Sequence, residues 1–515
     1  IPPASYKVVV NGSYAAASGA GSYVQGASVT IHAGSRSGYS FTGWISPDGV
    51  AFANASSATT TFAMPAKNVT VTANWSYNGG GGNSSGGSGS GSGYTPPAGW
   101  NITTDKKPNQ PTIASMDINA AIGTNGNAAI AITDAMTKAL IERAQAKAKA
   151  GGETADGIGV ALNILFGKSL GSITITVEAA AIDRLEREGA KLFGMNNPLV
   201  SFTLDAEAIK EVNKRSAGNV SFNASPITKL SDAAKGLIGS RPVFDVTVSY
   251  QKDGKRAYVS DLKKGMITLG IAYTLTSMEK SGNLYGVHVD KNGKQTLLTN
   301  SGYDNKRLIF SCNKMAAYGV GYKTPPPVFT DTAKHWAKDD IDFAAGRGLI
   351  SGTSATTFSP NMDITRQDFL MALGKLSGAD ISGYKESSFS DVSGANPAMP
   401  YIQWAVKNGI VQGIGGGKFG PDSVINREQM AVMMVNYAEY AGYKLPVSLQ
   451  AVTFADDAKI SSWAKEAVKA IQQSGVIIGK NNNRFDPAGN ATRGEASTIL
   501  RRFVELVIGE GMVRS

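Results

Sequence analysis

The chain has 515 residues, 60 glycines, a single cysteine and a formal net charge of +10. That length allows roughly three to four domains, and one cysteine excludes both an intrachain disulfide and a cysteine-based zinc cluster. The positive charge does not indicate a nucleic-acid partner, because Lys and Arg do not cluster with aromatic residues and no nucleic-acid motif occurs; an acidic polymer explains the sign equally well.

The start of the chain carries no targeting segment. It begins at Ile1 without a methionine or a charged-then-apolar leader, so we expect that a signal peptide has been removed. No stretch anywhere reaches the roughly 20 apolar residues that a transmembrane helix needs. Charged residues make up 17% of the chain, below the usual share of about 25%, which is typical of a linker-rich extracellular protein.

Residues 1–77 predict a small all-β module. Short β-branched runs are separated by Gly, Ser and Asn, as small antiparallel sheets require. Residues 38–44 (GYSFTGW) and 62–75 (FAMPAKNVTVTANW) resemble the divergent internalin B repeat, a β-rich spacer common in bacterial surface proteins. We expect Trp44 and Trp75 in the core of this module rather than on a ligand platform.

Residues 78–100 predict a linker. Residues 79–93 are almost entirely Gly and Ser, so this stretch should behave as a flexible coil. Pro96 and Pro97 stiffen its end. We therefore expect the β module to move independently of the rest of the chain.

Residues 101–323 predict an α+β domain. Residues 172–177 alternate like a half-buried strand and run into a helical stretch at 179–187, and residues 199–204 run in the same way into 206–214. This pattern indicates a degenerate β-α duplication. Antiparallel strands and two hairpin turns are expected beyond it, with strands at 243–250, 266–275, 284–289 and 306–310 and turns at Asp253-Gly254 and Asn292-Gly293.

The sequence contains few motifs that could indicate a catalytic or metal site. Residues 167–171 (GKSLG) match the G-x-S-x-G pattern, but they precede a strand instead of joining a strand to a helix. Glycines in residues 415–420 match a dinucleotide fingerprint by letters only, and residues 290–293 predict a hairpin turn sooner than a calcium loop. The three histidines fall in different domains, which excludes a histidine metal site and a conventional triad: His32, His288 and His335. We therefore predict no catalytic residue, no metal site and no cofactor.

Residues 324–328 contain three consecutive prolines and predict a short linker that holds its neighbours apart semi-rigidly. Beyond it, one pattern occurs three times with unchanged spacing. In each copy two glycines bracket a short apolar step, a Phe-x-Pro turn starts six residues later, and an arginine follows eight residues after the Phe. We predict three repeats, residues 329–385, 386–446 and 447–515, each too small to be stable alone and therefore sharing one core.

The repeated arginine lies in the first turn of a predicted helix in each copy: Arg366, Arg427 and Arg493. An N-cap residue precedes it (Thr365, Asn426 or Thr492), and an apolar stripe continues at helical spacing. A cation there opposes the helix macrodipole at a cost of roughly 0.3–1 kcal/mol. Two interpretations remain: the arginine pairs with a neighbouring carboxylate, or the guanidinium and free backbone N–H groups form a pocket for a carboxylate or phosphate.

These repeats resemble the S-layer homology (SLH) family. The Phe-x-Asp opening of that family occurs at residues 329–331, 389–391 and 454–456, and its Thr-Arg-Ala-Glu motif at residues 365–368 (TRQD), 426–429 (NREQ) and 492–495 (TRGE). The resemblance implies an all-α, three-pronged domain of pseudo-threefold symmetry, whose grooves between modules bind secondary cell-wall polysaccharide, often through a pyruvate ketal. The mixed region upstream is similar to the α+β spacers that often precede such modules.

Two positions depart from the family pattern. Trp336 and Trp463 lie twelve residues before the first glycine of their repeats, but the middle repeat has Pro397 there and Trp404 seven residues later. The middle groove is therefore expected to lack an aromatic wall. Gln429 stands where the family usually has Glu, so it can cap the helix but carries no charge.

Eight residues are predicted to bind polysaccharide: Arg366, Arg427, Arg493, Asp331, Asp391, Asp456, Trp336 and Trp463. The arginines would bind a carboxylate of the polymer. The aspartates would orient the fold or accept hydrogen bonds from sugar hydroxyls. The two tryptophans would form an apolar sugar platform or pack in the core.

The whole sequence predicts a multidomain, non-catalytic protein that anchors a bacterial surface or S-layer protein non-covalently to an anionic, pyruvylated secondary cell-wall polysaccharide. It would lie outside the cell, in the cell wall or S-layer of a Gram-positive-type bacterium, with residues 101–323 serving spacing or lateral self-association. The alternative is a wall-anchored enzyme or adhesin whose active domain is residues 101–323 or lies N-terminal to this chain.

Overall fold

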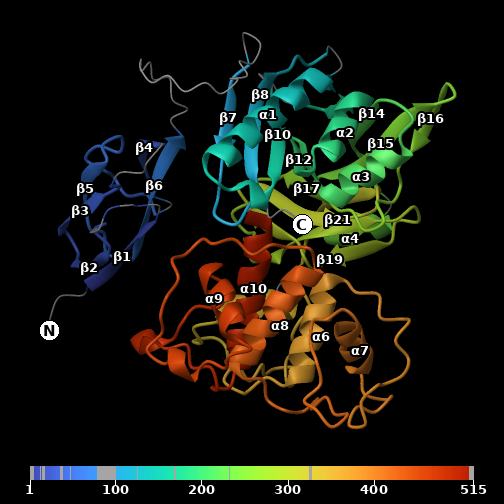
Figure 1. Cartoon of the computed structure of the whole chain (residues 1–515). Coiled ribbons are helices and arrows are strands. Elements are labelled where there is room, and N and C mark those ends of the chain that lie inside the picture. Colours follow the sequence, from blue (N-terminus) through green and yellow to red (C-terminus); the bar gives the residue numbers. More distant parts are fainter. Residues whose placement is uncertain are drawn as a thin grey trace. The chain divides into compact units, whose positions relative to one another are not determined.

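The computed structural model describes residues 5–11, 13, 15, 18–34, 39–46, 48–77, 100–123, 126–166, 170–230, 232–323 and 328–509. The chain divides into two compact units, Ile1–Ser92 and Gly93–Ser515 (Figure 1). Within the described ranges, every helix is too short or too polar to cross a lipid bilayer.

The first unit is built from β-strands, as the sequence predicts. Its strands are β1 (Ser5–Asn11), β2 (Gly21–Val24), β3 (Ser28–His32), β4 (Tyr39–Ile45), β5 (Thr59–Ala63) and β6 (Val69–Tyr77). They form a four-stranded sheet in the order β2-β1-β6-β4 and a β3-β5 pair, and β1 runs parallel to β6. Trp44 is buried in the core, and its Nε1 donates to the Ser57 carbonyl at 3.1 Å. The side chain of Trp75 and the predicted linker, residues 78–99, lie outside the described residues.

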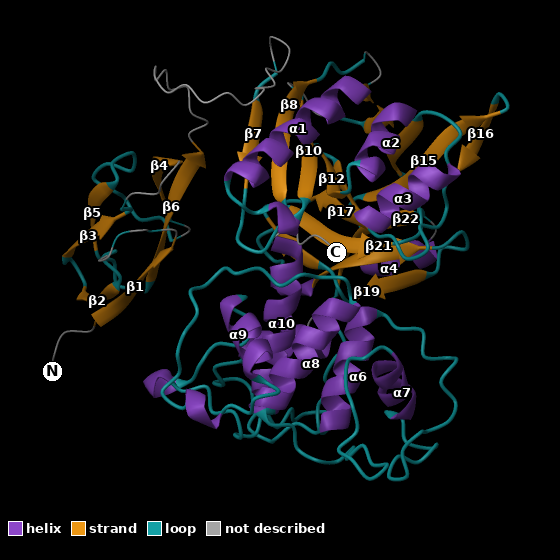
Figure 2. Cartoon of the chain, viewed as in Figure 1, coloured by secondary structure: helices purple, strands orange, loops and turns teal. Residues whose placement is uncertain are grey.

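The second unit begins with a region of mixed strands and helices (Figure 2). Its strands are β7 (Ile102–Asp105), β8 (Thr112–Asn119), β9 (Asn127–Ile132), β10 (Ile158–Leu165), β11 (Ser172–Val177), β12 (Ala190–Asn196), β13 (Val200–Asp205), β14 (Val220–Pro226), β15 (Val243–Lys252), β16 (Lys255–Tyr258), β17 (Ile267–Ala272), β18 (Leu284–Val289), β19 (Gln295–Leu298), β20 (Gly302–Asp304), β21 (Arg307–Cys312) and β22 (Ala317–Tyr322). Its α-helices are α1 (Asp134–Ala150), α2 (Ala179–Arg187), α3 (Ala206–Arg215) and α4 (Asp232–Ile238). We call these elements together the middle region.

The middle region contains two mixed sheets. Sheet I has the order β20-β21-β17-β13-β12-β10-β8-β7, and sheet II has the order β19-β18-β22-β15-β14-β11-β9, with β16 paired to β15. Strand β10 runs parallel to β8 and β12, and β11 runs parallel to β9, whereas the other pairs are antiparallel. Three consecutive β-α-β units link the two sheets: β9-α1-β10, β11-α2-β12 and β13-α3-β14. The sequence predicts the strand and helix of the second and third units but not their closing strands, β12 and β14; the first unit was not expected.

Burial explains the sequence pattern of the strands. Strand β11 alternates buried and half-buried residues, because one face only is covered. Strand β10 buries its first five residues in a row, which indicates that both faces are covered there. Phe202 of sheet I and Phe222 of sheet II meet with their ring centroids 6.1 Å apart, so the sheets share one core.

The remainder of the second unit is helical, as predicted for the repeats. Its helices are α5 (Lys338–Gly346), α6 (Arg366–Ser377), α7 (Met399–Lys407), α8 (Arg427–Tyr440), α9 (Lys465–Gln473) and α10 (Arg493–Gly509). They pack in three pairs, α5 with α10, α7 with α6, and α9 with α8, so that each pair takes its two helices from different repeats. Buried residues of all three repeats form a single core.

A ring of backbone hydrogen bonds ties the three repeats together. The Ile364 N–H donates to the Ala491 carbonyl at 2.9 Å, the Ala491 N–H to the Ile425 carbonyl at 3.0 Å, and the Ile425 N–H to the Ile364 carbonyl at 3.1 Å. Each of these residues lies just before the helix that carries a repeat arginine. The repeats therefore contact one another in a closed cycle.

The middle region and the helical region contact each other directly. Arg347, at the end of α5, is buried and donates to the carbonyls of Gly282 at 2.7 Å, Leu284 at 3.1 Å and Ser301 at 3.0 Å. The guanidinium also stacks on the ring of Phe343, 3.6 Å from its centroid. We expected the proline-rich stretch to hold these two regions apart, and their direct contact shows that this expectation is wrong. Residues 324–327 themselves lie outside the described residues.

Candidate functional site

Three aspartates organise the Phe-x-Pro turns of their own repeats. Asp331 accepts the backbone N–H groups of Phe358 at 2.9 Å and Ser359 at 2.7 Å. Asp391 accepts those of Phe419 and Gly420, both at 2.8 Å. Asp456 does the same in the third repeat, with Phe485 at 2.8 Å and Asp486 at 2.9 Å.

These bonds stabilise the ionised carboxylates. The Phe419 N–H is the main cause that holds the pKa of Asp391 below its ordinary value. Burial raises the pKa of Asp331 and of Asp456, but the backbone donors outweigh it, so both pKa values are also lowered. The structure thus places the aspartates where they orient the fold. Their contact with sugar hydroxyls stays a prediction.

Each repeat arginine reaches into the next repeat of the cycle. Arg366 Nε donates to the Phe419 carbonyl at 3.3 Å and its Nη2 to the Gln412 carbonyl at 3.1 Å. Arg427 contacts the carbonyls of Phe485 at 2.8 Å and Ile478 at 3.1 Å. Arg493 completes the cycle on the carbonyls of Phe358, at 2.9 Å, and Ser351. Each guanidinium also lies over the ring of the same phenylalanine.

The sequence left two interpretations of the repeat arginines, an ion pair with a neighbouring carboxylate or a pocket for an anion. The three arginines are 5% exposed, and burial lowers the pKa of all three guanidinium groups. Within the described residues a carboxylate lies in ion-pair range of Arg427 alone, where Nη1 is 3.3 Å from Glu495 Oε1. The main observed partners are therefore backbone carbonyls rather than a carboxylate. Direct binding of a polymer carboxylate by these arginines stays a prediction.

The tryptophans of the three repeats differ sharply in exposure. Trp336 is 66% exposed and Trp463 is 58% exposed, so the alternative that they pack in the core is wrong. Trp404 of the middle repeat is 2% exposed, and its Nε1 donates to the Tyr440 hydroxyl at 3.2 Å. The middle repeat therefore places its tryptophan in the core, and it has Pro397 at the position of Trp336 and Trp463. The absence of an aromatic wall in the middle groove stays a prediction.

Trp336 stands beside a hollow with several charged side chains. One part, of about 690 Å³, is lined by Trp336, Lys480, Arg484 and Glu495, and an adjoining part of about 190 Å³ adds Arg502 and Arg427. We call this hollow the α5/α10 groove, because Trp336 precedes α5 and Glu495 and Arg502 belong to α10. It combines residues of all three repeats.

The cations of the groove differ in how they are paired. Lys480 lies 3.5 Å from Glu495 and 3.2 Å from Asp486, and Arg484 lies 3.5 Å from Asp456. Arg502 has no ion-pair partner among the described residues. Its guanidinium can therefore meet an incoming anion without first breaking a contact.

Sequence reasoning missed these three cations. Lys480 and Arg484 flank the asparagines of a short turn, Asn481–Asn483, in which Asn482 and Asn483 adopt positive φ. The run KNNNR is the signal that could have marked this turn, because asparagine favours the left-handed conformation. Arg502 lies on the α10 face toward the groove, which periodicity alone did not reveal.

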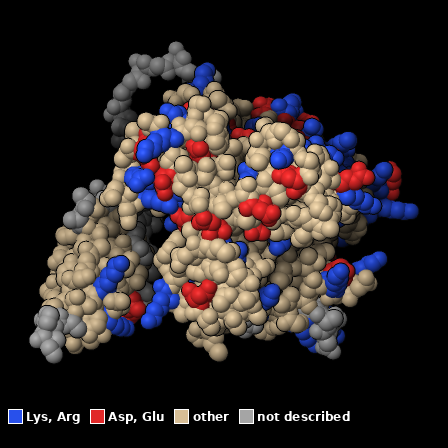
Figure 3. Space-filling model, turned by 90° about the horizontal axis from the view of Figure 1, so that it is seen from below, with Lys and Arg blue, Asp and Glu red and all other residues tan. Residues whose placement is uncertain are grey.

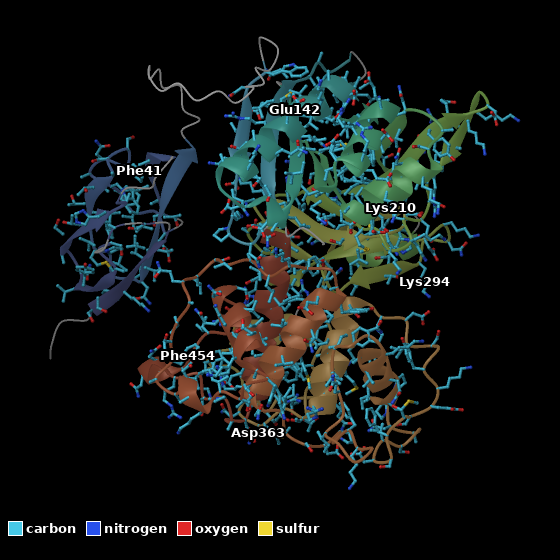
Figure 4. The ribbon with its side chains drawn as sticks, viewed as in Figure 1. Phe41, Glu142, Lys210, Lys294, Asp363 and Phe454 are labelled. Carbon is cyan, nitrogen blue, oxygen red and sulfur yellow. The ribbon has the colours of Figure 1, made fainter. Side chains whose placement is uncertain are left out.

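Contacts across repeats continue at the lower end of the helical region, where Figure 4 labels Asp363 and Phe454. The Asp363 carboxylate accepts from Asn490 Nδ2 at 2.7 Å and so joins the first repeat to the third. On the face drawn in Figure 3, acidic and basic side chains are interspersed instead of forming one continuous basic patch. On that face, recognition of an anion would therefore depend on local grooves and not on a broad positive patch.

Comparison with known families identifies two kinds of domain. The divergent InlB B-repeat domain matches residues 6–79, and the S-layer homology domain matches residues 328–370, 388–431 and 453–497. The chain contains three SLH domains and one divergent InlB B-repeat domain. These domains indicate a cell-surface or cell-wall location and a role in cell-wall anchoring.

Curated relatives include both enzymes and S-layer proteins. The chain is 35% identical to an amylopullulanase of Thermoanaerobacterium thermosulfurigenes over 34% of its own length and 9% of the relative. It is 34% identical to exoglucanase XynX of Acetivibrio thermocellus, over 34% of this chain and 16% of the relative. It is 26% identical to the S-layer protein sap of Bacillus anthracis, over 35% of this chain and 21% of the relative. The chain thus spans a small part of each relative, and its similarity to the enzymes runs through the SLH region.

Proposed function

We propose that the SLH region anchors this chain non-covalently to the bacterial cell wall by binding an anionic secondary cell-wall polysaccharide. The observation that carries the proposal is the α5/α10 groove, where the exposed ring of Trp336 stands beside Lys480, Arg484 and Arg502. A sugar ring can pack on the tryptophan while a carboxylate contacts the cations. A pyruvate ketal supplies such a carboxylate on a sugar ring, so we propose a pyruvylated polymer.

The three grooves are not equivalent under this proposal. The α5/α10 groove has an exposed tryptophan and, within the part of the chain that the structure describes, a cation without an ion-pair partner, and the α8/α9 pair has the exposed Trp463. The α6/α7 pair has Pro397 at the corresponding position. We therefore rank the α5/α10 groove as the strongest site and the α6/α7 side as the weakest.

The proposal includes the finer architecture. The closed cycle of backbone and arginine hydrogen bonds supports pseudo-threefold symmetry of three prongs. The arginines and aspartates would contribute to affinity by holding the groove walls, and the arginines also by direct charge. The domain boundaries stated from the sequence, with SLH modules at residues 329–385, 386–446 and 447–515, remain part of the proposal.

We further propose that the protein lies outside a Gram-positive-type cell, in the wall or S-layer. Residues 101–323 would serve spacing or lateral self-association and no turnover. The names of two relatives, an amylopullulanase and an exoglucanase, favour a second candidate: a wall-anchored enzyme or adhesin whose active domain is the middle region or lies N-terminal to this chain. The G-x-S-x-G residues 167–169, which bear on that candidate, lie outside the described residues.

Binding of purified secondary cell-wall polysaccharide to the whole chain tests the main proposal. Arg502→Ala should weaken binding by roughly ten- to a hundredfold, because a charge-assisted hydrogen bond is worth about 1.5–3 kcal/mol. Trp336→Ala should also weaken binding, because the sugar ring loses its packing surface. Lys294→Ala, an exposed change in the middle region, is the matched control (Figure 4). Chemical removal of pyruvate from the polymer should have a comparable effect on the wild-type chain.

Two results would contradict the proposal. Unchanged affinity of Trp336→Ala and Arg502→Ala, with folding intact, would show that the α5/α10 groove does not bind the polymer. Turnover of wall polymers or of esterase or glycosidase substrates by the Gly93–Ser515 unit would favour the second candidate instead.

A further inference from the structure

A second hollow lies between the helical region and the middle region. Its volume is about 690 Å³, within the usual range of about 300–1,000 Å³ for small-molecule sites. The helical side supplies the C-terminal ends of α6 and α8 and one side of α10. The middle region supplies the segments around Lys264, Asn300 and Asn313. We call it the inter-region pocket.

Aromatic rings form one wall of the inter-region pocket. Phe503 of α10 lies with its ring centroid 5.5 Å from that of Tyr437 and 6.2 Å from that of Tyr443. Tyr440 extends the row, with its ring 6.4 Å from Tyr437, and it is 41% exposed. The first three rings are buried and fixed by packing, so the wall is preformed. Tyr440 is therefore the ring of this row that offers a dispersion surface to the C–H face of a ring-shaped ligand, and the buried ring of Tyr437 packs behind it.

Three side-chain amides face this wall from three different segments. Asn313 Nδ2 donates to the Lys263 carbonyl at 3.1 Å, and Asn408 Nδ2 donates to the Trp404 carbonyl at 2.7 Å. These bonds orient both amides and use one of the two Nδ2 hydrogens of each. Among the described residues no donor reaches the Oδ1 atom of either side chain, and Asn300 makes no side-chain hydrogen bond. Hydroxyl groups of a ligand would find acceptors at Asn313 and Asn408, and a donor and an acceptor at Asn300.

The charges around the pocket favour a neutral ligand. Helices α6 and α8 direct their negative C-terminal ends at it, which disfavours an anion. Asp380 on the rim adds a carboxylate, and Lys264 on the opposite rim supplies a balancing cation. This setting contrasts with the α5/α10 groove, where cations gather beside Trp336.

We infer that the inter-region pocket binds a single neutral sugar ring, with Tyr440 under its apolar face and the three asparagines on its hydroxyl groups. The pocket needs both regions of the second unit, since Asn300 and Asn313 come from one and the rings from the other. The inference does not rest on polysaccharide binding at the α5/α10 groove. The sugar can come from a free saccharide or from a unit of a glycan chain.

Ligand-observed saturation-transfer NMR on the whole chain tests the inference, with N-acetylglucosamine and glucose as neutral probes and glucuronic acid as the anionic probe. At least one neutral probe should bind with a dissociation constant on the order of 1 mM. In the Trp336→Ala variant, which weakens the α5/α10 groove, glucuronic acid should bind at least tenfold more weakly than that neutral probe. Asn300→Trp should abolish binding by filling the pocket, and Asn300→Ala should weaken it at least threefold. Asn292→Trp, on an exposed hairpin turn, is the matched control and should bind as the wild type.

Trp336→Ala separates this inference from the proposed function, because it should leave neutral-sugar binding unchanged. A linear tetrasaccharide that binds tenfold more tightly than the single sugar would identify a glycan chain as the source, and equal affinity would identify a free sugar. Absence of binding by every neutral probe would overturn the inference. So would unchanged binding in a folded Asn300→Trp protein or, where that variant does not fold, unchanged binding in Asn300→Ala.

Discussion

The repeat arginines show how one side chain can serve a helix start and a contact between repeats at once. In Arg366 the planar guanidinium lets Nε and Nη2 reach two carbonyls on the neighbouring repeat, those of Phe419 and Gln412. A cation at a helix N-terminus is unfavourable by itself. The two carbonyl contacts and the aromatic ring beneath the guanidinium offset that cost, which explains why the chain keeps arginine at this position in each repeat.

Arg366→Ala should lower the free energy of unfolding by roughly 2–4 kcal/mol, because it removes two charge-assisted hydrogen bonds and leaves buried carbonyls without a donor. Arg366→Lys should lose most of the same free energy, since a single ammonium does not reproduce the fork. Urea unfolding of the whole chain measures both. Arg143→Ala, an exposed arginine on α1, is the control and should stay within about 0.5 kcal/mol. Full stability of Arg366→Lys would mean that charge alone matters at this position.

Sequence reasoning located the arginines but not their partners. The caps Thr365 and Asn426 accept from the backbone N–H groups of Asp368 and Gln429, as the capping pattern predicts, because a cap involves residues three positions apart. The acceptors of the arginines lie between 46 and 142 positions away in the chain. No local pattern encodes such a contact. The α5/α10 groove could not be predicted for the same reason, because its tryptophan and cations are far apart in the sequence and come together only through the cycle of repeats.

At the scale of elements, the main feature is that no repeat keeps its two helices together. The second helix of the first repeat, α6, packs on the first helix of the second repeat, α7, and the other pairs follow the same rule. The apolar face of each helix is thus covered by a neighbouring repeat. The hydrogen-bond ring through Ile364, Ile425 and Ala491 adds a backbone link between all three.

A fragment of residues 329–385 should therefore not fold alone. It would expose the face of α6 that α7 covers, and the Ile364 N–H and carbonyl would lose their partners. Circular dichroism with urea titration should show no cooperative transition, whereas residues 329–509 should show one. A stable native baseline in the short fragment would refute the shared core.

Helices and strands of the middle region were predictable where apolar and polar residues follow a clear periodic pattern. Helix α2 and strand β11 begin and end at the residues expected from the sequence. In β11 apolar residues alternate with Ser and Thr, and in α2 Ile182 and Leu185 stand at helical spacing among charged residues. Helix α1 was missed because its buried face includes small residues such as Thr137, Ala144 and Ala148. These residues differ little in hydrophobicity from the residues on its exposed face. The parallel neighbours β8, β10 and β12 are far apart in the chain, so their pairing could not be derived from local periodicity.

At the scale of the whole molecule, the chain consists of two units that differ in how their parts are joined. The Ile1–Ser92 unit has its own core of β-strands. In the Gly93–Ser515 unit the middle region and the helical region have separate cores, but they are joined by direct contacts. Asn109 Nδ2 donates to the Leu445 carbonyl at 2.7 Å on one side, and Arg347 makes three such bonds on the other.

Arg347→Ala should uncouple the two regions of the second unit. The buried guanidinium bridges the carbonyls of Gly282, Leu284 and Ser301 and lies between the rings of Phe343 and Tyr285, and burial lowers its pKa to about 10. Its loss leaves those carbonyls without their donor and a hole between the rings, at a cost of roughly 2–4 kcal/mol. In scanning calorimetry the wild-type chain should show one transition for the Ile1–Ser92 unit and one for the Gly93–Ser515 unit. In Arg347→Ala the second transition should split in two, while Arg143→Ala should leave it single. A second transition that stays single and unshifted in Arg347→Ala would mean that the remaining contacts, such as those of Asn109, suffice to couple the regions.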